Sequence, residues 1–365
     1  MTGALAEQFA AEPATTRGPH PGRPPYEWYT STELLEIERR HVFDRSWALV
    51  GTPDDLPEPG SYLTVIIGTS PIVVLRDKDG VIRAFHNLCR HRGLPLLEGR
   101  ARCAGHITCP YHQWSYDLTG NLRRVPQLAN QFEGMDLSEW GLHPAAVDIW
   151  HGMVFVNPEP TSVPLDEASA GLAERLEPFL DGPLTEVARV SYRANCNWKL
   201  LVENHIDVYH LWYLHNRSLA MYDHRSFEWE TQSNNWWSYE PLKDPAGAPE
   251  PPIGWLDQSE REGIGAHLLF PNLMLVTTGS YFATYDAIPI APDQTVLTLR
   301  VRAEAGADAE ALVASVRSFM AEDVAVCERL QKGANSSRFS TGPLAATHEA
   351  PVRNFHRALA GLCDV

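Results

Sequence analysis

The alternation of apolar and polar residues changes along the chain and predicts different elements in different segments. Residues 31–47, STELLEIERRHVFDRSW, predict a helix, because Ser31 is a suitable N-cap and glutamates follow it in the first turns. From about residue 45 the pattern has the period of two that strands show. The segments SPIVVLRDKDGVIRAFHN and QWSYDLTGNLRR each predict two strands joined by a glycine turn. Residues 147–157, VDIWHGMVFVN, predict one further apolar strand.

The pattern becomes mixed after the segment PEPTSVP. Helical spacing is found near residues 165–180, 198–215 and 307–332, and strand patterns near 268–277, 281–289 and 294–303. Such a mixture predicts an α+β domain built on an antiparallel sheet. The expected organisation is an N-terminal arm and helix, with a loose Pro-, Gly- and Thr-rich stretch at 10–26, then a small all-β domain and a larger second domain, with the bounds 1–44, 45–157 and 158–365.

Composition narrows the class of protein. The 365 residues suffice for two domains, and 44% apolar with 21% charged residues is typical of a soluble globular chain. No apolar run approaches the roughly 20 residues of a membrane-spanning helix, and the N-terminus lacks the pattern of a signal peptide, so we expect a cytoplasmic protein without membrane contact. A net charge of −16 argues against nucleic acid as a partner. Without a secretion signal, the six cysteines are expected to be thiols or metal ligands.

Two short turns each carry one cysteine and one histidine. Cys89 and His91 form C-x-H, and Cys109 and His112 form C-x2-H after a spacer of 17 residues. A structural zinc site usually pairs its cysteines in one place and its histidines in another. One residue of each kind in each turn instead favours a two-iron cluster, in which one iron binds both thiolates and the other both imidazoles. Zinc, or turns without metal, are the alternatives. The remaining thiols are expected to be ordinary core or surface residues, namely Cys103, Cys196, Cys327 and Cys363.

These four residues match, ligand for ligand, the cluster motif of a known family, and in this respect the chain resembles the Rieske non-heme iron oxygenases. Within that motif Pro110, Tyr111 and Trp114 are expected to shield the second loop from water. Small Rieske ferredoxins and respiratory Rieske subunits, which only carry electrons, share the same motif. The second half of the chain must therefore distinguish an oxygenase from a carrier.

Residues 197–215, NWKLLVENHIDVYHLWYLH, contain His205, His210 and His215 at intervals of five. A step of five residues turns a helical side chain by about 140° relative to its starting face, so two such histidines share a metal only if the helix ends or distorts between them. Spacing alone leaves two pairs open, 205 with 210 and 210 with 215. Asp207 lies three residues before His210 and could hydrogen-bond to its imidazole.

The resemblance selects the second pair as ligands of a mononuclear non-heme Fe(II). The family's second motif runs Asn-Trp-Lys, Glu-Asn, an acid, Tyr-His and a histidine five residues further, which matches residues 197–199, 203–204, 207, 209–210 and 215. His205 then becomes a surface or packing residue. The same comparison marks Asn204 and Asp207 as catalytic-site residues, with Asp207 as the bridge for electron transfer.

The third ligand of such an iron is expected to be a carboxylate. The segment DAEALVASVRSFMAEDVAVCERLQKG has one apolar stripe at helical spacing, made of Leu312, Val316, Phe319, Met320, Cys327 and Leu330. Asp323 falls in the middle of this stripe and Glu322 at its margin. A core-facing carboxylate is costly unless a cation meets it, so Asp323 is the better candidate ligand. The alternative is a buried partner for an arginine or a helix end. The resemblance also favours Asp323, since the family places its third ligand in a C-terminal acidic pair.

Together the motifs resemble the terminal oxygenase (alpha subunit) of a multicomponent Rieske system. The implied fold is α+β: an all-β Rieske [2Fe-2S] domain inserted after an N-terminal helix, followed by a catalytic domain with an antiparallel sheet flanked by helices. The implied assembly is a homotrimer in which Asp207 joins His91 or His112 of one chain to His210 of the next. The chain has no G-x-G-x-x-G after a strand and no plant-type cluster motif, so electrons from NAD(P)H are expected through a separate reductase, with a ferredoxin as a further candidate carrier.

The expected reaction uses O2 to hydroxylate or dihydroxylate a small organic, aromatic substrate. Some amine-oxidising members of the family carry Glu where this chain has Asp207, which favours the ring-hydroxylating branch. The alternative is a monooxygenase or demethylase of a methylated amine, such as a quaternary ammonium compound, whose cation aromatic rings can hold. A Rieske electron carrier and a zinc-stabilised binding module are hypotheses from different functional classes. The candidate pocket residues are aromatic, and most of them are expected to belong to the core instead: Trp212, Tyr213, Trp236, Trp237, Tyr239, Tyr281, Phe282 and Tyr285.

Overall fold

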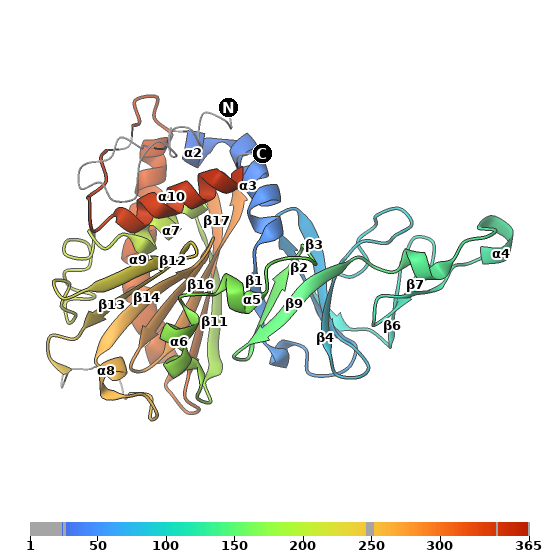
Figure 1. Ribbon diagram of the computed structural model, residues 1–365, viewed down its shortest axis with the longest axis horizontal. Coiled ribbons are helices and arrows are strands. Elements are labelled where there is room, and N and C mark those ends of the chain that lie inside the picture. Colours follow the sequence, from blue (N-terminus) through green and yellow to red (C-terminus); the bar gives the residue numbers. More distant parts are fainter. Residues whose placement is uncertain (1–23, 25–26, 246–251, 341, 364–365) are drawn as a thin grey trace. The chain divides into compact units, whose positions relative to one another are not determined.

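The computed structural model describes residue 24 and residues 27–245, 252–340 and 342–363. Apart from Pro24, the arm predicted at 10–26 lies outside the described residues. The described chain divides into two units (Figure 1). The β unit comprises residues 38–165, and the α+β unit comprises the described residues before and after it. Within the described residues, no helix combines the length and the apolar character needed to cross a membrane.

The β unit is built on a seven-stranded antiparallel sheet in the order β1-β10-β9-β4-β3-β2-β5. Its strands are β1 (Ala48–Gly51), β2 (Ser61–Ile67), β3 (Ser70–Arg76), β4 (Ile82–His86), β5 (Arg100–Arg102), β9 (Pro144–Trp150) and β10 (Met153–Asn157). A second sheet, in the order β6-β7-β8, contains β6 (His106–Thr108), β7 (Ser115–Asp117) and β8 (Leu122–Arg124). Short helical segments are η1 (Phe43–Arg45), η2 (Pro53–Asp55), α4 (Leu128–Gln131) and η3 (Leu137–Trp140), while α3 (Thr32–His41) and α5 (Leu165–Ala168) cross the unit boundaries.

Strand β3 shows how the large sheet of the β unit carries an apolar core on each face. Val73 and Leu75 pack with Cys89 and Cys109, whereas Ile72 and Val74 belong to a separate apolar cluster. Successive side chains of a strand point to opposite faces, so one uninterrupted apolar run supplies both cores. The two cysteines of the motif are therefore anchored in a packed interior.

The two glycine hairpins of the β unit use the same turn chemistry. The sequences DKDGVIR and DLTGNLR both place a glycine three residues after an aspartate and an arginine six residues after it. Asp77 accepts hydrogen bonds from the turn N–H groups and pairs with Arg83 at 2.7 Å. Asp117 does the same and pairs with Arg123 at 2.6 Å. An aspartate that binds its own turn is a local signal, which is why the sequence predicts these hairpins correctly.

The single strand predicted over residues 147–157 is wrong, because the segment contains parts of two strands. β9 and β10 pair with each other, from Met153 opposite Trp150 to Asn157 opposite Ala146. The turn between them places His151 and Gly152 at positive φ, 47° and 74°. Histidine adopts this conformation less readily than glycine or asparagine, so an apolar stretch with His-Gly at its middle gives only a weak turn signal.

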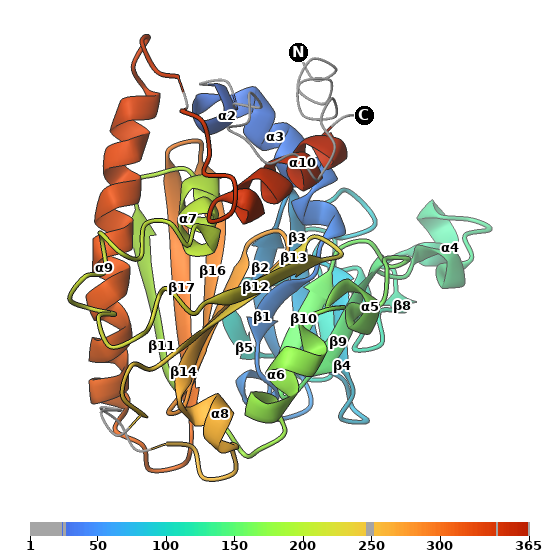
Figure 2. The ribbon, with the colours of Figure 1, turned by 60° about the vertical axis from the view of Figure 1, so that its left-hand side comes forward.

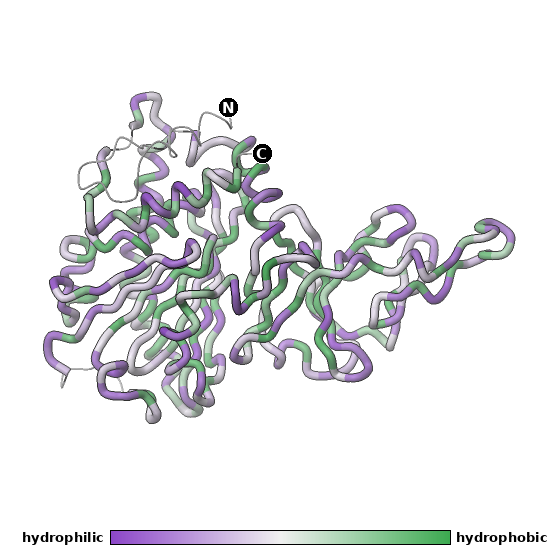
Figure 3. The backbone as a smooth tube through the Cα atoms, in the orientation of Figure 1, coloured by the Kyte–Doolittle hydropathy of each residue, from purple (hydrophilic) through white to green (hydrophobic). Residues whose placement is uncertain are grey.

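The α+β unit contains a second seven-stranded antiparallel sheet in the order β11-β17-β16-β15-β14-β13-β12. Its strands are β11 (Thr185–Ala194), β12 (Glu228–Gln232), β13 (Asn235–Pro241), β14 (Gly263–Leu269), β15 (Leu273–Thr278), β16 (Phe282–Ala291) and β17 (Gln294–Ala303). The helices are α2 (Glu27–Thr30), α6 (Ala173–Leu180), α7 (Trp198–Ile206), α8 (Gln258–Arg261), α9 (Ala309–Ala334) and α10 (Ala350–Cys363). Figure 3 colours long stretches of the strands as hydrophobic and many of their turns as hydrophilic.

Helices α7 and α9 pack against each other and against this sheet, α7 on β14 and β16, and α9 on β11 and β17 (Figure 2). The expected α+β class is confirmed, and β16 and β17 lie close to the predicted strands. The strand predicted at 268–277 is wrong, since it joins the end of β14 to most of β15. Pro271 and Asn272 separate the two strands, and residues of these types commonly interrupt a strand.

The helix predicted over residues 198–215 ends at Ile206, before the second histidine. Asp207 has an extended conformation, and its side chain accepts a hydrogen bond from Tyr209 N at 2.7 Å. The N–H of Val208 donates to the carbonyl of His348 instead of continuing the helix. Residues 209–221 consequently form turns, which removes the helical obstacle to a shared metal at His210 and His215.

Helix α7 begins at a buried cap on Asn197. Its side-chain oxygen accepts from Lys199 N at 3.0 Å, and its Nδ2 donates to the carbonyl of Pro292 at 2.6 Å. Replacing Asn197 with alanine should lower the free energy of unfolding by about 2–3 kcal/mol, because the cap is lost together with the donor to the Pro292 carbonyl and to the buried carbonyl of Tyr29.

The measurement is calorimetry of both cap variants. We expect the transition of the Asn197→Ala protein to fall by roughly 4–8 °C. Asp308→Ala removes the exposed cap of α9 and is the matched control, with an expected cost of about 1 kcal/mol or less. Equal effects of the two substitutions would contradict the role of burial.

Candidate metal sites and the adjoining pocket

Cys89 and Cys109 occupy equivalent places in two turns of the β unit. In each turn the cysteine N–H donates to the carbonyl five residues later, and the cysteine carbonyl accepts from the N–H four residues later, all at 2.8–3.0 Å. The residues at that fourth position, Gly93 and Gln113, have positive φ values of 71° and 60°. The two motifs therefore fold as a pair of matching loops that present a cysteine and a histidine each.

The two loops bring their side chains together in pairs. Nδ1 of His91 lies 3.1 Å from Nδ1 of His112. Both thiols are buried, and burial is the largest cause of the raised pKa of Cys109, which also interacts with Cys89. A two-iron cluster with mixed ligands requires two ring nitrogens that face one point and two adjacent thiols, and the two loops provide this set of donors.

The same four atoms do not form a single-ion site. Among the described residues, a group of three or more ligand atoms lying within 4.8 Å of one another occurs only at His210, His215 and Asp323. A tetrahedral zinc ion, with ligands about 2.0–2.3 Å away, would need all four atoms that close. The separation of the cysteine pair from the histidine pair thus argues against the zinc alternative.

Aromatic side chains surround the histidine pair. His91 stacks on the buried ring of Trp114, with centroids 4.9 Å apart, and Tyr111 lies against His112 at 3.7 Å. Tyr111 itself is 56% exposed, so it covers the histidine from the solvent side. Tyr116, which the sequence did not single out, accepts from Arg90 N and lies 3.4 Å from Cys89 Sγ. A hydroxyl beside a ligand sulfur is the kind of neighbour that tunes a cluster's potential.

The second group of ligand atoms lies in the α+β unit. Asp323 Oδ1 is 2.9 Å from Nε2 of His215 and 3.6 Å from Nε2 of His210. The histidines come from the turns after α7 and the aspartate from the middle of α9. Two imidazoles and one carboxylate around a common point form the donor set of a mononuclear non-heme iron.

A further carboxylate stands behind each of these histidines. Asp207 Oδ2 lies 3.5 Å from Nδ1 of His210, and Glu322 Oε2 lies 2.8 Å from Nδ1 of His215. Ser218 also donates to Glu322 at 2.6 Å. Partial burial opposes ionisation of Glu322, but the hydrogen bonds from Ser218 and His215 outweigh it and lower its pKa. The hydrogen bond to Glu322 can fix the tautomer and orientation of His215, whereas Nδ1 of His210 has no hydrogen-bond partner among the described residues and Asp207 only lies near it.

His205 does not belong to this group of three ligand atoms, although it lines the pocket described next. Its Nε2 contacts the carbonyl of His267 at 2.9 Å, and its ring meets the edge of Trp236. Burial lowers the pKa of His205 to about 4 and the pKa of His267 to about 3. Both rings are therefore neutral at ordinary pH and contribute to packing. Asn204 lines the pocket described next.

A pocket adjoins the three ligand atoms, and we call it the catalytic pocket. Its floor follows one face of the sheet, because alternate residues of β13 and their partners on β14 and β15 point the same way. These floor residues are Trp236, Ser238, Glu240, Ile264, Ala266 and Val276. Phe319 and Asp323 of α9 form a wall, one helical turn apart.

Of the eight candidate aromatic residues, three line pockets and five do not, in keeping with the expectation that most of them belong to the core. Trp236 lines the catalytic pocket, Tyr281 lines a neighbouring one, and Tyr285 lines a third that also touches Asp323. The other five do not line these three pockets. Trp237 and Tyr239 alternate with the floor residues and face away, Phe282 is fully buried, Tyr213 is 68% exposed, and Trp212 contacts the ring of His348.

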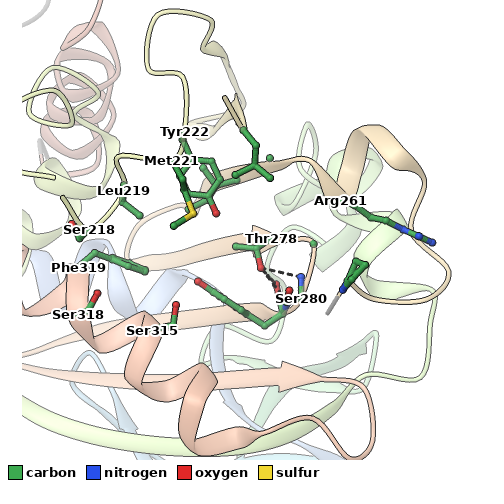
Figure 4. Close-up of a pocket in the computed structure, with 16 residues that line it drawn as sticks. Ser218, Leu219, Met221, Tyr222, Arg261, Thr278, Ser280, Ser315, Ser318 and Phe319 are labelled. Atoms are coloured by element: carbon green, nitrogen blue, oxygen red, sulfur yellow. Dashed lines mark hydrogen bonds between the residues drawn. The ribbon is translucent and has the colours of Figure 1, made fainter. Parts of the chain in front are cut away.

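The neighbouring pocket, shown in Figure 4, shares Leu219, Ile264 and Phe319 with the catalytic pocket. Ser315 and Ser318 of α9 stand on one side of it, and Met221 and Tyr222 on the other. Phe319 thus lies between the two spaces.

Sequence reasoning missed Glu240 and Phe319 as pocket residues. The segment NNWWSYEP drew attention for its aromatic rings, whereas its alternation places Glu240 on the same face as Trp236. Phe319 precedes Asp323 by four residues, so it shares the face of α9 that carries the ligand. The sequence contains both signals. The two-residue period of a strand places Glu240 beside Trp236 in the pocket, and the 3.6-residue period of a helix places Phe319 beside Asp323.

Comparison with known proteins gives a family for each part of the chain. The model described as "Ring hydroxylating alpha subunit (catalytic domain)" matches residues 181–364, and the model "Rieske [2Fe-2S] domain" matches residues 46–141. A glycine betaine monooxygenase oxygenase subunit from Chromohalobacter salexigens is 28% identical over 91% of this chain and 83% of its own length.

Two further similarities are to proteins that are named for other substrates, benzene and quaternary ammonium compounds. The benzene 1,2-dioxygenase subunit alpha of Pseudomonas putida is 36% identical, over 52% of this chain and 44% of its own length. Among solved structures, a quaternary ammonium Rieske monooxygenase in complex with L-carnitine superposes with a TM-score of 0.76 at 25% identity, covering 93% of this chain and 94% of that one.

Proposed function

The chain belongs to the Rieske oxygenase alpha subunits, non-heme iron mono- and dioxygenases, and from this premise we propose that it oxidises a quaternary ammonium compound. The observation that carries the proposal is the catalytic pocket, which lies beside His210, His215 and Asp323 and is lined by Trp236 and Phe319. The similarity to a glycine betaine monooxygenase subunit, which spans most of both chains, supports the substrate class. It favours the amine alternative over the aromatic substrate first expected.

We propose that His210, His215 and Asp323 hold the mononuclear iron, and that Cys89, Cys109, His91 and His112 hold the [2Fe-2S] cluster. The iron, when bound, supplies O2 activation and the insertion of oxygen into a C–H bond, while the cluster supplies electrons. The chain's own residues do the rest. Glu322 orients His215 through a hydrogen bond and Asp207 lies beside His210, while the apolar residues of the floor and Phe319 exclude water from the substrate.

The electron supply forms part of the proposal. Asp207 is 20% exposed and contacts His210, and Tyr209 beside it is 47% exposed. We propose a homotrimer in which Asp207 receives His91 or His112 of a neighbouring chain and links it to His210. Electrons from NAD(P)H would reach the cluster through a separate reductase, with or without a ferredoxin.

A second candidate function is dihydroxylation of an aromatic ring. It is supported by the 36% identity with a benzene dioxygenase subunit over half of this chain. The bridging aspartate in place of glutamate, Asp207, points in the same direction. The two candidates predict different products and different fates of the two atoms of O2, so an experiment can distinguish them.

The test is substrate-dependent O2 uptake by the holoenzyme with a reductase and NADH. We expect choline, glycine betaine or carnitine to stimulate uptake, and benzene and naphthalene to leave it at the background rate. Hydroxylation of an N-methyl carbon places one atom of O2 in the product and one in water, consumes two electrons and two protons, and releases formaldehyde when the product collapses. Because the inserted atom leaves with the formaldehyde, the demethylated amine should carry no label after 18O2 exposure, and one formaldehyde should form per O2 consumed. Two labelled atoms on an aromatic ring would establish the second candidate instead.

A further inference from the structure

Glu240 is a buried carboxylate on the floor of the catalytic pocket. It lies on β13 opposite Ile264 of β14, on the strand face that it shares with Trp236 and Ser238. Its side chain is almost fully enclosed, since the residue is only 4% exposed. Neither the iron ligands nor the residues that orient them include Glu240, so its position in the pocket needs another explanation.

The described partner of Glu240 is His224, whose Nδ1 lies 2.5 Å from Oε2. His224 is also buried, at 7% exposed, and its Nε2 has no hydrogen-bond partner among the described residues. A neutral ring that donates its Nδ1–H leaves only a lone pair unpaired at Nε2. A positively charged ring would bury an N–H without an acceptor, which costs more. Among the described residues, this histidine is the only ion-pair partner of Glu240, and no arginine or lysine pairs with the carboxylate.

A buried carboxylate without a full counter-charge is costly, and such groups are kept mainly where a ligand or a second charge meets them. The other two carboxylates that line this pocket, Asp207 and Asp323, face the iron histidines. Glu240 is thus the carboxylate of this pocket that is left to interact with a bound substrate. Trp236 and Phe319 line the same pocket, and aromatic side chains also attract cations.

We propose that Glu240 is the specificity-determining counter-charge of the pocket, selecting a substrate with a permanently cationic tetraalkylammonium group over a neutral one of the same shape. This inference rests on the proposed function and names the residue that enforces it. A purely structural role, in which the pair fastens β13 to the turn at residues 223–226, is the competing explanation.

Glu240→Gln separates the two explanations, because the amide oxygen still accepts from His224 while the charge is lost. The probes are choline and its neutral carbon isostere, 3,3-dimethylbutan-1-ol, with binding to the iron-loaded holoenzyme measured by calorimetry. We expect the wild type to bind choline about 10- to 100-fold more tightly than the isostere. In Glu240→Gln the two affinities should agree within about threefold, with that of the isostere unchanged.

Glu228→Gln, on the adjacent strand β12 and outside the three pockets, is the matched loss of one negative charge and should retain the wild-type preference. Circular dichroism and the electron paramagnetic resonance signal of the reduced cluster report on folding. Should Glu240→Gln fail to fold, the double variant Glu240→Met with His224→Leu, which removes both partners of the buried hydrogen bond, makes the same comparison.

The outcomes distinguish this inference from the proposed function. A Glu240→Gln protein that still prefers choline would overturn the counter-charge and leave the ammonium oxygenase intact. A wild type that binds the isostere as tightly as choline would overturn both. Loss of the preference in Glu240→Gln alone would support both.

Discussion

Replacing Asp323 with alanine is expected to remove the mononuclear iron and to lower substrate turnover by more than about 100-fold. Loss of an outer-shell partner of a metal ligand typically costs about 10–100-fold, so loss of a ligand should cost more. Asp323 Oδ1 is the atom that both histidine Nε2 atoms approach, at 2.9 and 3.6 Å, so its removal leaves two imidazoles without the carboxylate. The cluster ligands are in the other unit, so the Rieske signal should persist.

The measurement combines iron and sulfide analysis with electron paramagnetic resonance on anaerobically purified protein. The wild type should contain one iron per chain more than the variant, and both should show the reduced cluster. Glu310→Gln, an exposed acid in the first turn of the same helix, is the control and should keep all the iron. A wild type with a cluster and no additional iron would sink the oxygenase proposal and leave an electron carrier.

The second large effect is expected at Asp207. Asp207→Ala should retain both metal sites yet lower steady-state turnover by about 100-fold or more, because the carboxylate that contacts His210 is removed from the proposed electron path. Rapid mixing of the fully reduced enzyme with substrate and O2 would show slow reoxidation of the cluster, seen in its visible absorbance.

Two companion variants make this result specific. Asp207 also accepts from Tyr209 N at 2.7 Å, and Asp207→Asn can keep that bond while losing the charge, so it separates the shape of the turn from electron transfer. Tyr209→Phe changes the exposed neighbour and should leave reoxidation close to the wild-type rate. Fast cluster reoxidation in Asp207→Ala would refute the assigned bridge.

Most of the correct predictions rest on residues that are close together in the sequence. Ser31 caps its helix through Leu34 N, and the two aspartate–glycine turns form because each aspartate binds its own backbone. The apolar stripe of the last long helix placed Asp323 at a core-facing position, and the structure brings its carboxylate to His210 and His215. These features depend on residues a few positions apart, which a single sequence displays directly.

One error involves a partner that is distant in sequence. Helix α7 ends where Val208 donates to His348, about 140 residues later, and the local contribution to that end is the hydrogen bond from Tyr209 N to Asp207. The aromatic segment around Trp236 was judged by residue type, although the pleat of β13 decides that Trp236 and Glu240 face the pocket and Trp237 does not. The substrate class depends in the same way on which side chains share that floor, and the comparisons favour the amine alternative over the aromatic substrate first expected.

The catalytic pocket draws its two halves from different elements: the iron ligands from α9 and the turns after α7, and the floor from β13, β14 and β15. Chemistry and substrate choice are thereby separable in evolution. Exchanges among Trp236, Ser238, Glu240 and Ile264 would alter the floor and leave the proposed ligands His210, His215 and Asp323 in place. If the proposed function holds, substitutions on this one face of the sheet should be enough to change the preference between ammonium and neutral substrates.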